Sequence, residues 1–106
     1  MKLVLSPEAA RDLGDIHDFT ADRWGDKQAQ SYLRRLHAAC VDLAANPDKG
    51  RRRSDVPPPY RVLTVDSHLV IYRTVDDRVE MLNVLHPAMD LAARLRAALA
   101  GQVGKP

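Results

Sequence analysis

The sequence contains a single cysteine, Cys40, so no disulfide can form within the chain. Such scarcity is typical of proteins from reducing compartments, where disulfides do not persist. The apolar run near the N-terminus covers only residues 3–5, far short of a signal-peptide core. No stretch approaches the roughly 18 apolar residues of a membrane span. We therefore expect a cytoplasmic protein that makes no membrane contact.

Aromatic residues and net charge are also scarce. Phe, Trp and Tyr together make up 5% of the 106 residues, so the core must form mainly from aliphatic side chains. The formal net charge of +2 is too small to predict nucleic-acid binding by itself. The histidines at positions 17, 37 and 68 have no partner at ligand spacing, and Walker loops and dinucleotide glycines are absent. We expect no metal, no cofactor and no direct sequence-specific contact with nucleic acid.

Residues 3–5 predict a short strand, and a helix is expected to follow directly. Ser6 can cap the free amide groups of a new helix, and Pro7 suits the first helical position. Apolar residues then recur at helical spacing up to Trp24, which we assign first to the core stripe. The stripe consists of Ala9, Leu13, Ile16, Thr20 and Trp24.

The turn between this helix and the next is short. Gly25 predicts the end of the first helix, since glycine readily takes the left-handed conformation of many helix stops. Asp26 is expected to cap a second helix, whose apolar stripe continues until Asn46-Pro47 stops it. Two helices joined so closely must run antiparallel as a hairpin.

Beyond a proline-rich loop, the apolar period changes from helical to two. Residues 60–65, 69–75 and 79–85 predict three strands joined by short polar turns. Residues 89–99 predict a final amphipathic helix, and residues 101–106 a loose tail. The order of elements favours one α+β domain over residues 1–100, with the hairpin covering one sheet face and the other face partly open.

A set of short motifs occurs in a fixed order between residues 3 and 95. They are Ser6-Pro7-Glu8-Ala9-Ala10, Asp22-Arg23-Trp24-Gly25, Gln28-Ala29, Tyr32-Leu33, Asn46-Pro47, Gly50, Tyr60-Arg61, Ser67-His68, Tyr72-Arg73, Val84-Leu85-His86 and Met89-Asp90. In order and spacing this set resembles the ParE toxins of the RelE/ParE superfamily. The resemblance implies an N-terminal strand and a helical hairpin packed on a curved antiparallel sheet.

The same resemblance implies a function and two protein partners. It suggests the toxin of a type II toxin–antitoxin system, which inhibits DNA gyrase by protein–protein binding rather than by catalysis. A ParD-type antitoxin is expected to neutralise it within a hetero-oligomer. No residue is expected to be catalytic.

Two groups of residues are candidates for these contacts. The candidates for target binding or toxicity are Arg61, Arg73, His86, Met89 and Asp90. The candidates for antitoxin binding are Phe19, Trp24, Tyr32, Arg61, Tyr72 and Arg73. Arg61 and Arg73 both occupy odd-numbered positions of predicted strands, and we expect them to lie at the rim of one groove. The alternative is that both arginines only form ion pairs at the edge of the sheet.

Two other functions remain open. A ribosome-dependent RNase of RelE type could use Arg61, Arg73 and His86. Glu80 would be its carboxylate: by strand alternation it shares a face with His86, and the two residues are about 20 Å apart if the strand is straight. The C-terminal tyrosine typical of such RNases is missing. A toxin-like binding module without toxicity is the third reading, because Pro87-Ala88 replaces a polar pair common in the family.

The segment Lys49 to Arg53 forms a dense basic loop. Runs of like charge are usually solvated. If the loop is functional, it could attract an acidic antitoxin or lie near the DNA held by gyrase.

Overall fold

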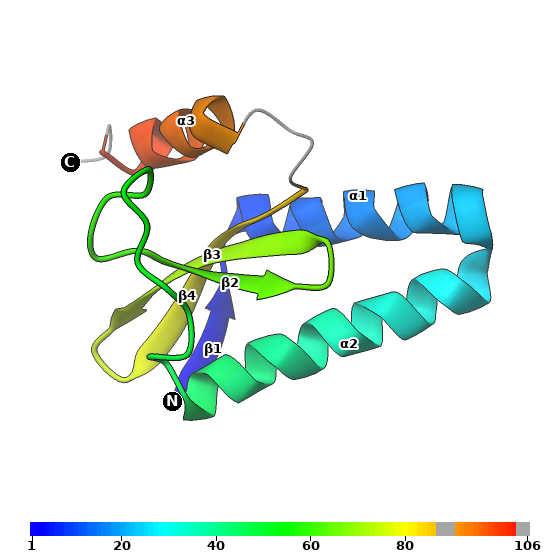
Figure 1. The fold of residues 1–106 in the computed structure, drawn as a ribbon, viewed down its shortest axis with the longest axis horizontal. Helices are drawn as coiled ribbons and strands as arrows, with labels where there is room; N and C mark the ends of the chain where they lie inside the picture. The colour runs from blue at the N-terminus through cyan, green and yellow to red at the C-terminus, as the bar shows by residue number, and fades with distance from the viewer. Residues whose placement is uncertain (87–90, 104–106) are drawn as a thin grey trace.

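The computed structural model describes residues 1–86 and 91–103 and confirms the α+β fold (Figure 1). Its elements, in chain order, are β1 (Lys2–Leu5), α1 (Pro7–Trp24), α2 (Asp26–Ala45), β2 (Arg61–Val65), β3 (His68–Val75), β4 (Arg78–Leu85) and α3 (Leu91–Val103). They form one four-stranded sheet in the order β1-β4-β3-β2, with β1 parallel to β4 and the other pairs antiparallel. Helix α3 ends at Val103, beyond the end predicted at residue 99. Within the described ranges, no helix is both long and apolar enough to cross a membrane.

Ser6 begins α1 as predicted and also ties the helix to the sheet. Its Oγ accepts a hydrogen bond from the amide of Ala9 at 2.9 Å and donates one to the carbonyl of Leu82 at 2.7 Å. The backbone amide of Ser6 donates to the carbonyl of Met81 at 2.9 Å. The start of the hairpin is thus fixed against β4.

A single residue, Gly25, joins the two helices. Its φ of 92° is positive but its ψ of 164° is extended, a combination that is essentially restricted to glycine. Gly25 therefore ends α1 as predicted, but the left-handed conformation that we expected there is wrong, because the ψ angle differs. The expected cap at Asp26 is also wrong: this residue is already the first of α2, and no side-chain hydrogen bond caps the helix. Asp26 instead places a carboxylate in the first turn, where the helix dipole favours negative charge.

Gly14 offers a stability test within α1. It is exposed in the middle of the helix, and a Cβ built there would meet nothing within 4 Å. Gly14→Ala should therefore raise the free energy of unfolding by about 0.5–1 kcal/mol, because alanine loses less backbone entropy in a helix. Urea unfolding monitored by circular dichroism would measure this. An unchanged or lower stability would contradict the open surroundings of this position.

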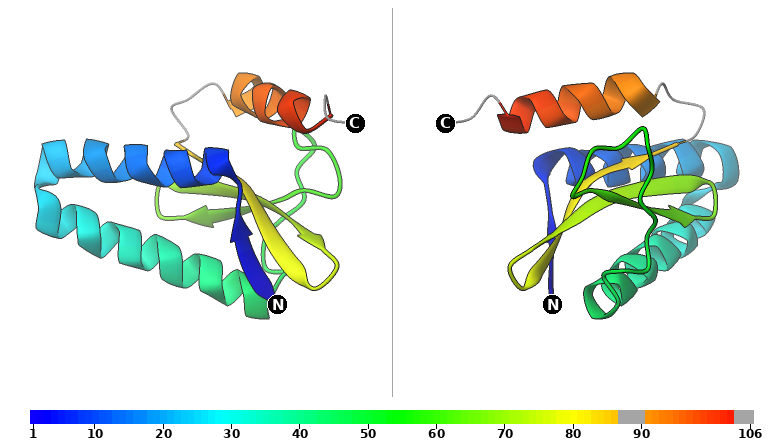
Figure 2. Two further views of the ribbon diagram at one scale, coloured as in Figure 1. Left: turned by 180° about the vertical axis from the view of Figure 1, so that it is seen from behind. Right: turned by 60° about the vertical axis from the view of Figure 1, so that its left-hand side comes forward.

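The two sheet faces carry separate cores. The hairpin covers one face, where Leu36 and Leu43 of α2 pack with Val70 of β3, and the predicted stripe of α2 lies there with only Leu33 partly buried. The other face, which was expected to be partly open, is also covered. Val56 and Tyr60 from the loop over residues 46–60, and Leu95 from α3, pack onto it. Figure 2 shows the hairpin on one side of the sheet and this loop crossing the other side.

A β-bulge shifts the pairing of β3 with β4 by one residue. Tyr72 pairs with Met81, but the next pair along the ladder is Ile71 with Asn83, so Leu82 is the extra residue. A bulge reverses the alternation of side chains beyond it. The last residues of β4 therefore point to faces opposite to those that simple parity predicts.

Candidate functional site

Two histidines from distant positions meet at the end of the β3–β4 hairpin. Leu69 pairs with Leu85, and continuing this register places His68 opposite His86. Their ring centroids are 5.3 Å apart in an edge-to-face arrangement with an interplanar angle of 76°. Without the bulge, position 68 would face position 85, so the extra residue in β4 creates the pair.

Tyr32 of α2 completes this cluster from the hairpin side. Its hydroxyl forms a hydrogen bond with Nδ1 of His68, and both side chains are buried. Burial, followed by the charge of His86, lowers the pKa of His68, whereas Asp66 acts weakly in the opposite direction. The neutral ring suits this contact because an unprotonated Nδ1 can accept a hydrogen bond from the Tyr32 hydroxyl.

The lowered pKa of His68 predicts a loss of stability in mild acid. The unfolded chain, with an ordinary histidine pKa near 6.5, binds the proton more readily than the folded chain. The free energy of unfolding therefore loses nothing through His68 well above pH 6.5. It falls as the pH drops below 6.5, by at most about 1.4 kcal/mol per pH unit. Urea unfolding at pH 7.5, 6.5 and 5.5 measures it.

The variant His68→Gln should flatten this pH dependence. His37→Gln is the matched control because His37 is exposed on α2, and it should leave the slope as in the unchanged protein. Equal slopes in all three proteins would show that His68 does not titrate differently on unfolding.

A hollow of ≈ 460 Å³ opens beside the histidine pair, and we call it the histidine hollow. Its lining consists of Asp12, Asp15, Ile16, Phe19, His68, Val84, His86 and Arg94. Phe19 stands at its border with 59% of its surface exposed, and the guanidinium of Arg23 lies 5.1 Å from the centre of its ring. This part of the molecule offers apolar surface to a partner.

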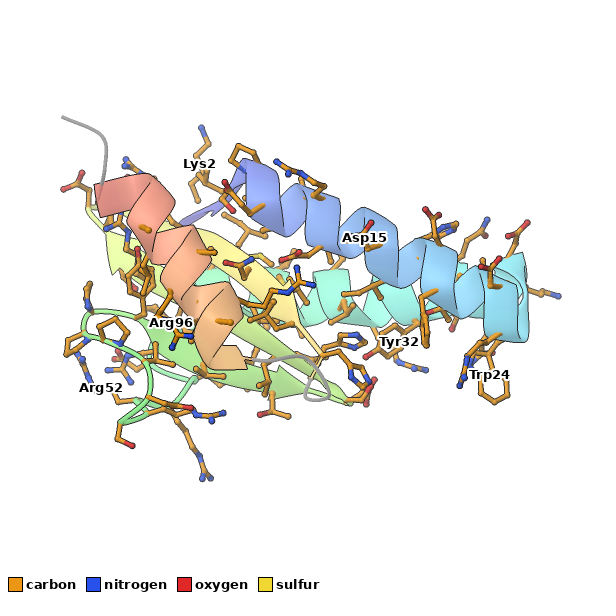
Figure 3. The ribbon with its side chains drawn as sticks, turned by 90° about the horizontal axis from the view of Figure 1, so that it is seen from above. Lys2, Asp15, Trp24, Tyr32, Arg52 and Arg96 are labelled. Atoms are coloured by element: carbon orange, nitrogen blue, oxygen red, sulfur yellow. The ribbon has the colours of Figure 1, made fainter. Side chains whose placement is uncertain are left out.

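Trp24 lies at the tip of the hairpin and not in the core. It is 70% exposed, so its assignment to the core stripe is wrong (Figure 3). The hairpin extends well beyond the edge of the sheet, and its last turn therefore has no sheet to pack against (Figures 1 and 2). Helical periodicity identifies the face of a residue but cannot show where the neighbouring layer ends.

Tyr72, an antitoxin candidate, has no exposed surface. Its hydroxyl donates to the carbonyl of Pro47 at 2.7 Å and accepts from the amide of Gly50 at 2.8 Å. A Cβ on Gly50 would collide with the Tyr72 ring and hydroxyl, so only glycine fits there. Tyr72 therefore holds the loop to the sheet and offers no contact surface to a partner in this conformation. Tyr32, another antitoxin candidate, is nearly as deeply buried.

Arg61 and Arg73 lie on opposite faces of the sheet, which contradicts their placement on one rim. Arg61 pairs with Tyr72 in the ladder, on the hairpin side, and donates to the carbonyl of Gly50 at 3.1 Å. Arg73 pairs with Glu80 on the other side, where its guanidinium lies 5.6 Å from the centre of the Tyr60 ring. Equal parity in two different strands does not imply a common face, because the turn between the strands sets their relative register.

Glu80 is held by two arginines and does not share a face with His86. Arg73 donates to one carboxylate oxygen at 2.9 Å and Arg78 to the other at 2.8 Å. The hydrogen bond from Arg78, together with the one from Arg73, keeps the pKa of Glu80 below its usual range. Because the bulge lies between Glu80 and His86, the proposed acid–base pairing is wrong.

The remaining reactive groups in the described part of the chain are either buried or solvated. Burial raises the pKa of the Cys40 thiol to about 11, so it stays protonated. No three His, Cys, Asp or Glu side chains gather as metal ligands within residues 1–86 and 91–103. Met89 and Asp90, both toxicity candidates, lie outside the described residues.

The basic loop is partly neutralised by its own surroundings. Lys49 forms an ion pair with Asp42 at 2.7 Å, and Arg53 binds both oxygens of Asp55 at 2.9 and 2.7 Å. Arg51 and Arg52 are exposed. These contacts fit best with the interpretation that the basic run is a solvated surface loop.

The histidine pair was the feature that sequence reasoning missed. Positions 68 and 86 flank a hairpin, so their proximity could have been deduced from the turn at residues 76–77 once the strands were assigned. The bulge, which places them directly opposite, has no clear signal in the sequence.

Comparisons with known proteins agree with this fold. A family model described as "ParE toxin of type II toxin-antitoxin system, parDE" matches residues 3–91. Toxin ParE1 of Mycobacterium tuberculosis (strain CDC 1551 / Oshkosh) is 42% identical over 95 residues, which cover 89% of this chain and 97% of that protein. Toxin ParE1 of Caulobacter vibrioides is 40% identical over 91 residues, covering 86% and 94%. A chain from the chromosomal ParDE TA system of P. aeruginosa has a TM-score of 0.72 at 23% identity, covering 81% of this chain and 95% of that one.

Proposed function

The chain belongs to the ParE toxin family of type II toxin–antitoxin systems, and from this premise we propose that it inhibits DNA gyrase by protein–protein binding. The observation that carries the proposal is the family match over residues 3–91, together with relatives whose length is covered almost completely. ParE toxins as a family are expected to act on gyrase, and this chain has the family's ordered set of motifs.

The chemistry of the described residues supports binding over catalysis. A ribonuclease needs a base, an acid and free cations around the phosphate. Here Glu80 is occupied by two arginines, and His68 is buried against Tyr32. Glu80 and His86 point to different faces. RNase activity of RelE type therefore remains the second candidate.

We further propose that a ParD-type antitoxin neutralises the chain by wrapping it within a hetero-oligomer. Phe19 and Trp24 are the proposed apolar anchors because both are large and exposed. Arg61 and Arg73 stay in the proposal, although only a segment that passes around a sheet edge could reach both faces. A segment that folds on contact can cover such a long path.

A gyrase assay tests the leading proposal. The purified chain, at micromolar concentration, should block supercoiling of plasmid DNA by gyrase and accumulate cleaved DNA, and added antitoxin should restore supercoiling. Unimpaired supercoiling together with cleavage of ribosome-bound messages would instead establish the RNase. Expression without antitoxin that leaves growth unaffected, with neither activity, would identify a binding module without toxicity.

The proposed target contacts are Arg61, Arg73, His86, Met89 and Asp90. Among these, His86 can be tested cleanly because it is partly exposed at the histidine hollow. His86→Gln should reduce gyrase inhibition, while His37→Gln should not. Equal inhibition by the two variants would remove His86 from the contact set.

A further inference from the structure

The helical hairpin leaves the sheet at one level, marked by Ile16 on α1 and Tyr32 on α2. Both residues belong to the core cluster between the hairpin and the sheet. Ala29 is buried, but none of residues 17–31, all of which the structure describes, belongs to that cluster, and we call this segment the overhang. From Ile16 to Trp24 it extends about 12 Å, at 1.5 Å per residue. Figures 1 and 3 show the overhang projecting past the strands, with Trp24 near its end.

The start of the hairpin is fixed to the sheet separately from this level. The hydroxyl of Ser6 donates to the carbonyl of Leu82 at 2.7 Å. Oδ2 of Asp12 accepts from the amide of Val84 at 2.9 Å and from the side chain of Asn83 at 3.0 Å. These bonds hold the first two turns of α1 against β4. A change at the level of Tyr32 can therefore move the overhang while the start of α1 stays in place.

Two side-chain contacts join α2 to the beginning of β3 at this level. The hydroxyl of Tyr32 forms a hydrogen bond with Nδ1 of His68, and both side chains are buried. One turn along α2, Nε of Arg35 lies 3.4 Å from a carboxylate oxygen of Asp66. Both members of that ion pair are more than half exposed, and such surface pairs contribute little. The bond between Tyr32 and His68 is therefore the stronger of the two ties.

A proton on His68 would disrupt this bond. Both ring nitrogens of an imidazolium are donors, so Nδ1 could no longer accept from the Tyr32 hydroxyl. The side chain of His68 is 8% exposed, and a charged ring at such a site loses most of its hydration. The charged or titratable groups that face this region from the neighbouring elements are Arg35 of α2, Asp66 of the β2–β3 turn, His86 after β4 and, around the histidine hollow, Asp12 and Asp15 of α1 and Arg94 of α3.

We propose that Tyr32 and His68 form a clamp that fixes the overhang on the sheet at neutral pH, and that protonation of His68 in mild acid releases it. Release brings the charged ring into water and takes it away from the ring of His86, whose centroid lies 5.3 Å away in the clamped form. Because burial keeps the pKa of His68 below the ordinary value of 6.5, release occurs below that pH. One bound proton shifts the equilibrium between the two forms by at most about tenfold per pH unit.

The test follows two NMR signals of the full chain between pH 8 and pH 5: the ring protons of His68 and the indole N–H of Trp24. Trp24 is the single tryptophan of the chain and lies on the overhang. Both signals should change with one common midpoint below pH 6.5. Time-resolved fluorescence anisotropy should show wider motion of Trp24 at pH 5.5 than at pH 7.5, with the helical circular dichroism unchanged. A Trp24 signal that stays constant while His68 titrates would overturn the proposal.

Three histidine variants identify the group that acts on the overhang. His68→Gln keeps an acceptor for the Tyr32 hydroxyl but does not titrate, so the response of Trp24 to pH should disappear. His17→Gln is one matched control, because His17 lies on the overhang itself, 3.3 Å from Asp18. His37→Gln, at an exposed position of α2, is the other. Both controls should keep the midpoint of the unchanged protein. A response that survives His68→Gln, or that disappears in His17→Gln, would contradict the clamp.

Tyr32→Phe removes the other half of the clamp. The phenyl ring fills the same space but has no hydroxyl for His68, so the overhang should be released at every pH. The anisotropy of Trp24 in this variant at pH 7.5 should therefore match that of the unchanged protein at pH 5.5. Motion as restricted as in the unchanged protein at pH 7.5 would show that the hydrogen bond does not hold the overhang.

The clamp also predicts a change in antitoxin binding, and this step alone rests on the proposed function. Phe19 and Trp24, the proposed anchors, both lie on the overhang, and a released overhang no longer presents them in one arrangement. Calorimetry should therefore show the antitoxin affinity falling below pH 6.5 by up to about tenfold per pH unit more than for His68→Gln. Equal pH dependence in the two proteins would remove the clamp from antitoxin binding. An antitoxin that fails to bind at pH 7.5 would contradict the proposed function, whereas the Trp24 measurements test the clamp on the toxin alone.

Discussion

Trp24→Ala should weaken the binding of a ParD-type antitoxin by about 30-fold or more, equivalent to roughly 2 kcal/mol, without unfolding the toxin. Trp24 is 70% exposed at the tip of the hairpin, where it contributes little to the fold. Large aromatic side chains that become buried at an interface commonly dominate its affinity. Isothermal titration calorimetry with the antitoxin measures the loss, and urea unfolding should shift by no more than about 0.5 kcal/mol.

Val41→Ala is the matched control for this variant. Val41 is another exposed apolar residue, 50% accessible on α2, but is not a proposed contact. Its removal should change the antitoxin affinity by less than about twofold. Similar losses for both variants would point to non-specific apolar association. A strongly destabilised Trp24→Ala protein would instead show that this side chain packs in the fold.

Tyr72→Phe should lower the free energy of unfolding by about 2–4 kcal/mol, the largest stability change that we expect from removing one atom. The Tyr72 hydroxyl is the partner of the Gly50 amide and of the Pro47 carbonyl. Leaving a buried donor or acceptor without its partner costs about 1–3 kcal/mol each. The loop over residues 46–60 also carries Val56 and Tyr60 into the second core, so its loosening should be felt there.

Tyr32→Phe provides the comparison. It removes a hydroxyl from a similarly buried tyrosine whose hydrogen bond is to one group, Nδ1 of His68. The loss of stability should therefore be smaller than for Tyr72→Phe. Urea unfolding of both variants at pH 7.5 decides the order, and a larger loss for Tyr32→Phe would contradict the anchoring role given to Tyr72.

The helical hairpin and the hairpins of the sheet were predictable because they depend on local chemistry. The stripe of α2, with Leu36, Cys40 and Leu43, follows from helical spacing. Ser6 caps α1 because serine side chains accept from helix amides wherever a helix starts. The strands followed from period-two alternation between polar turns, and the family motifs added the order of the layers.

The candidate site was predicted only in part, because proximity between strands depends on register. One extra residue in β4 turns His86 toward His68 and away from the face of Glu80. Arg61 and Arg73 fall on opposite faces for a related reason: the turn between β2 and β3, not the residue numbers, aligns their strands.

The sequence by itself determined the elements, their order and the family of this protein, since capping, periodicity and turn residues act over a few neighbours. The tertiary structure alone decided which apolar residues are covered. Trp24 is exposed because the sheet ends before the helices do. The sheet face opposite the hairpin is covered because Val56 and Tyr60 of the loop and Leu95 of α3 pack onto it. Such outcomes depend on the lengths of layers packed side by side, a quantity that local sequence does not contain.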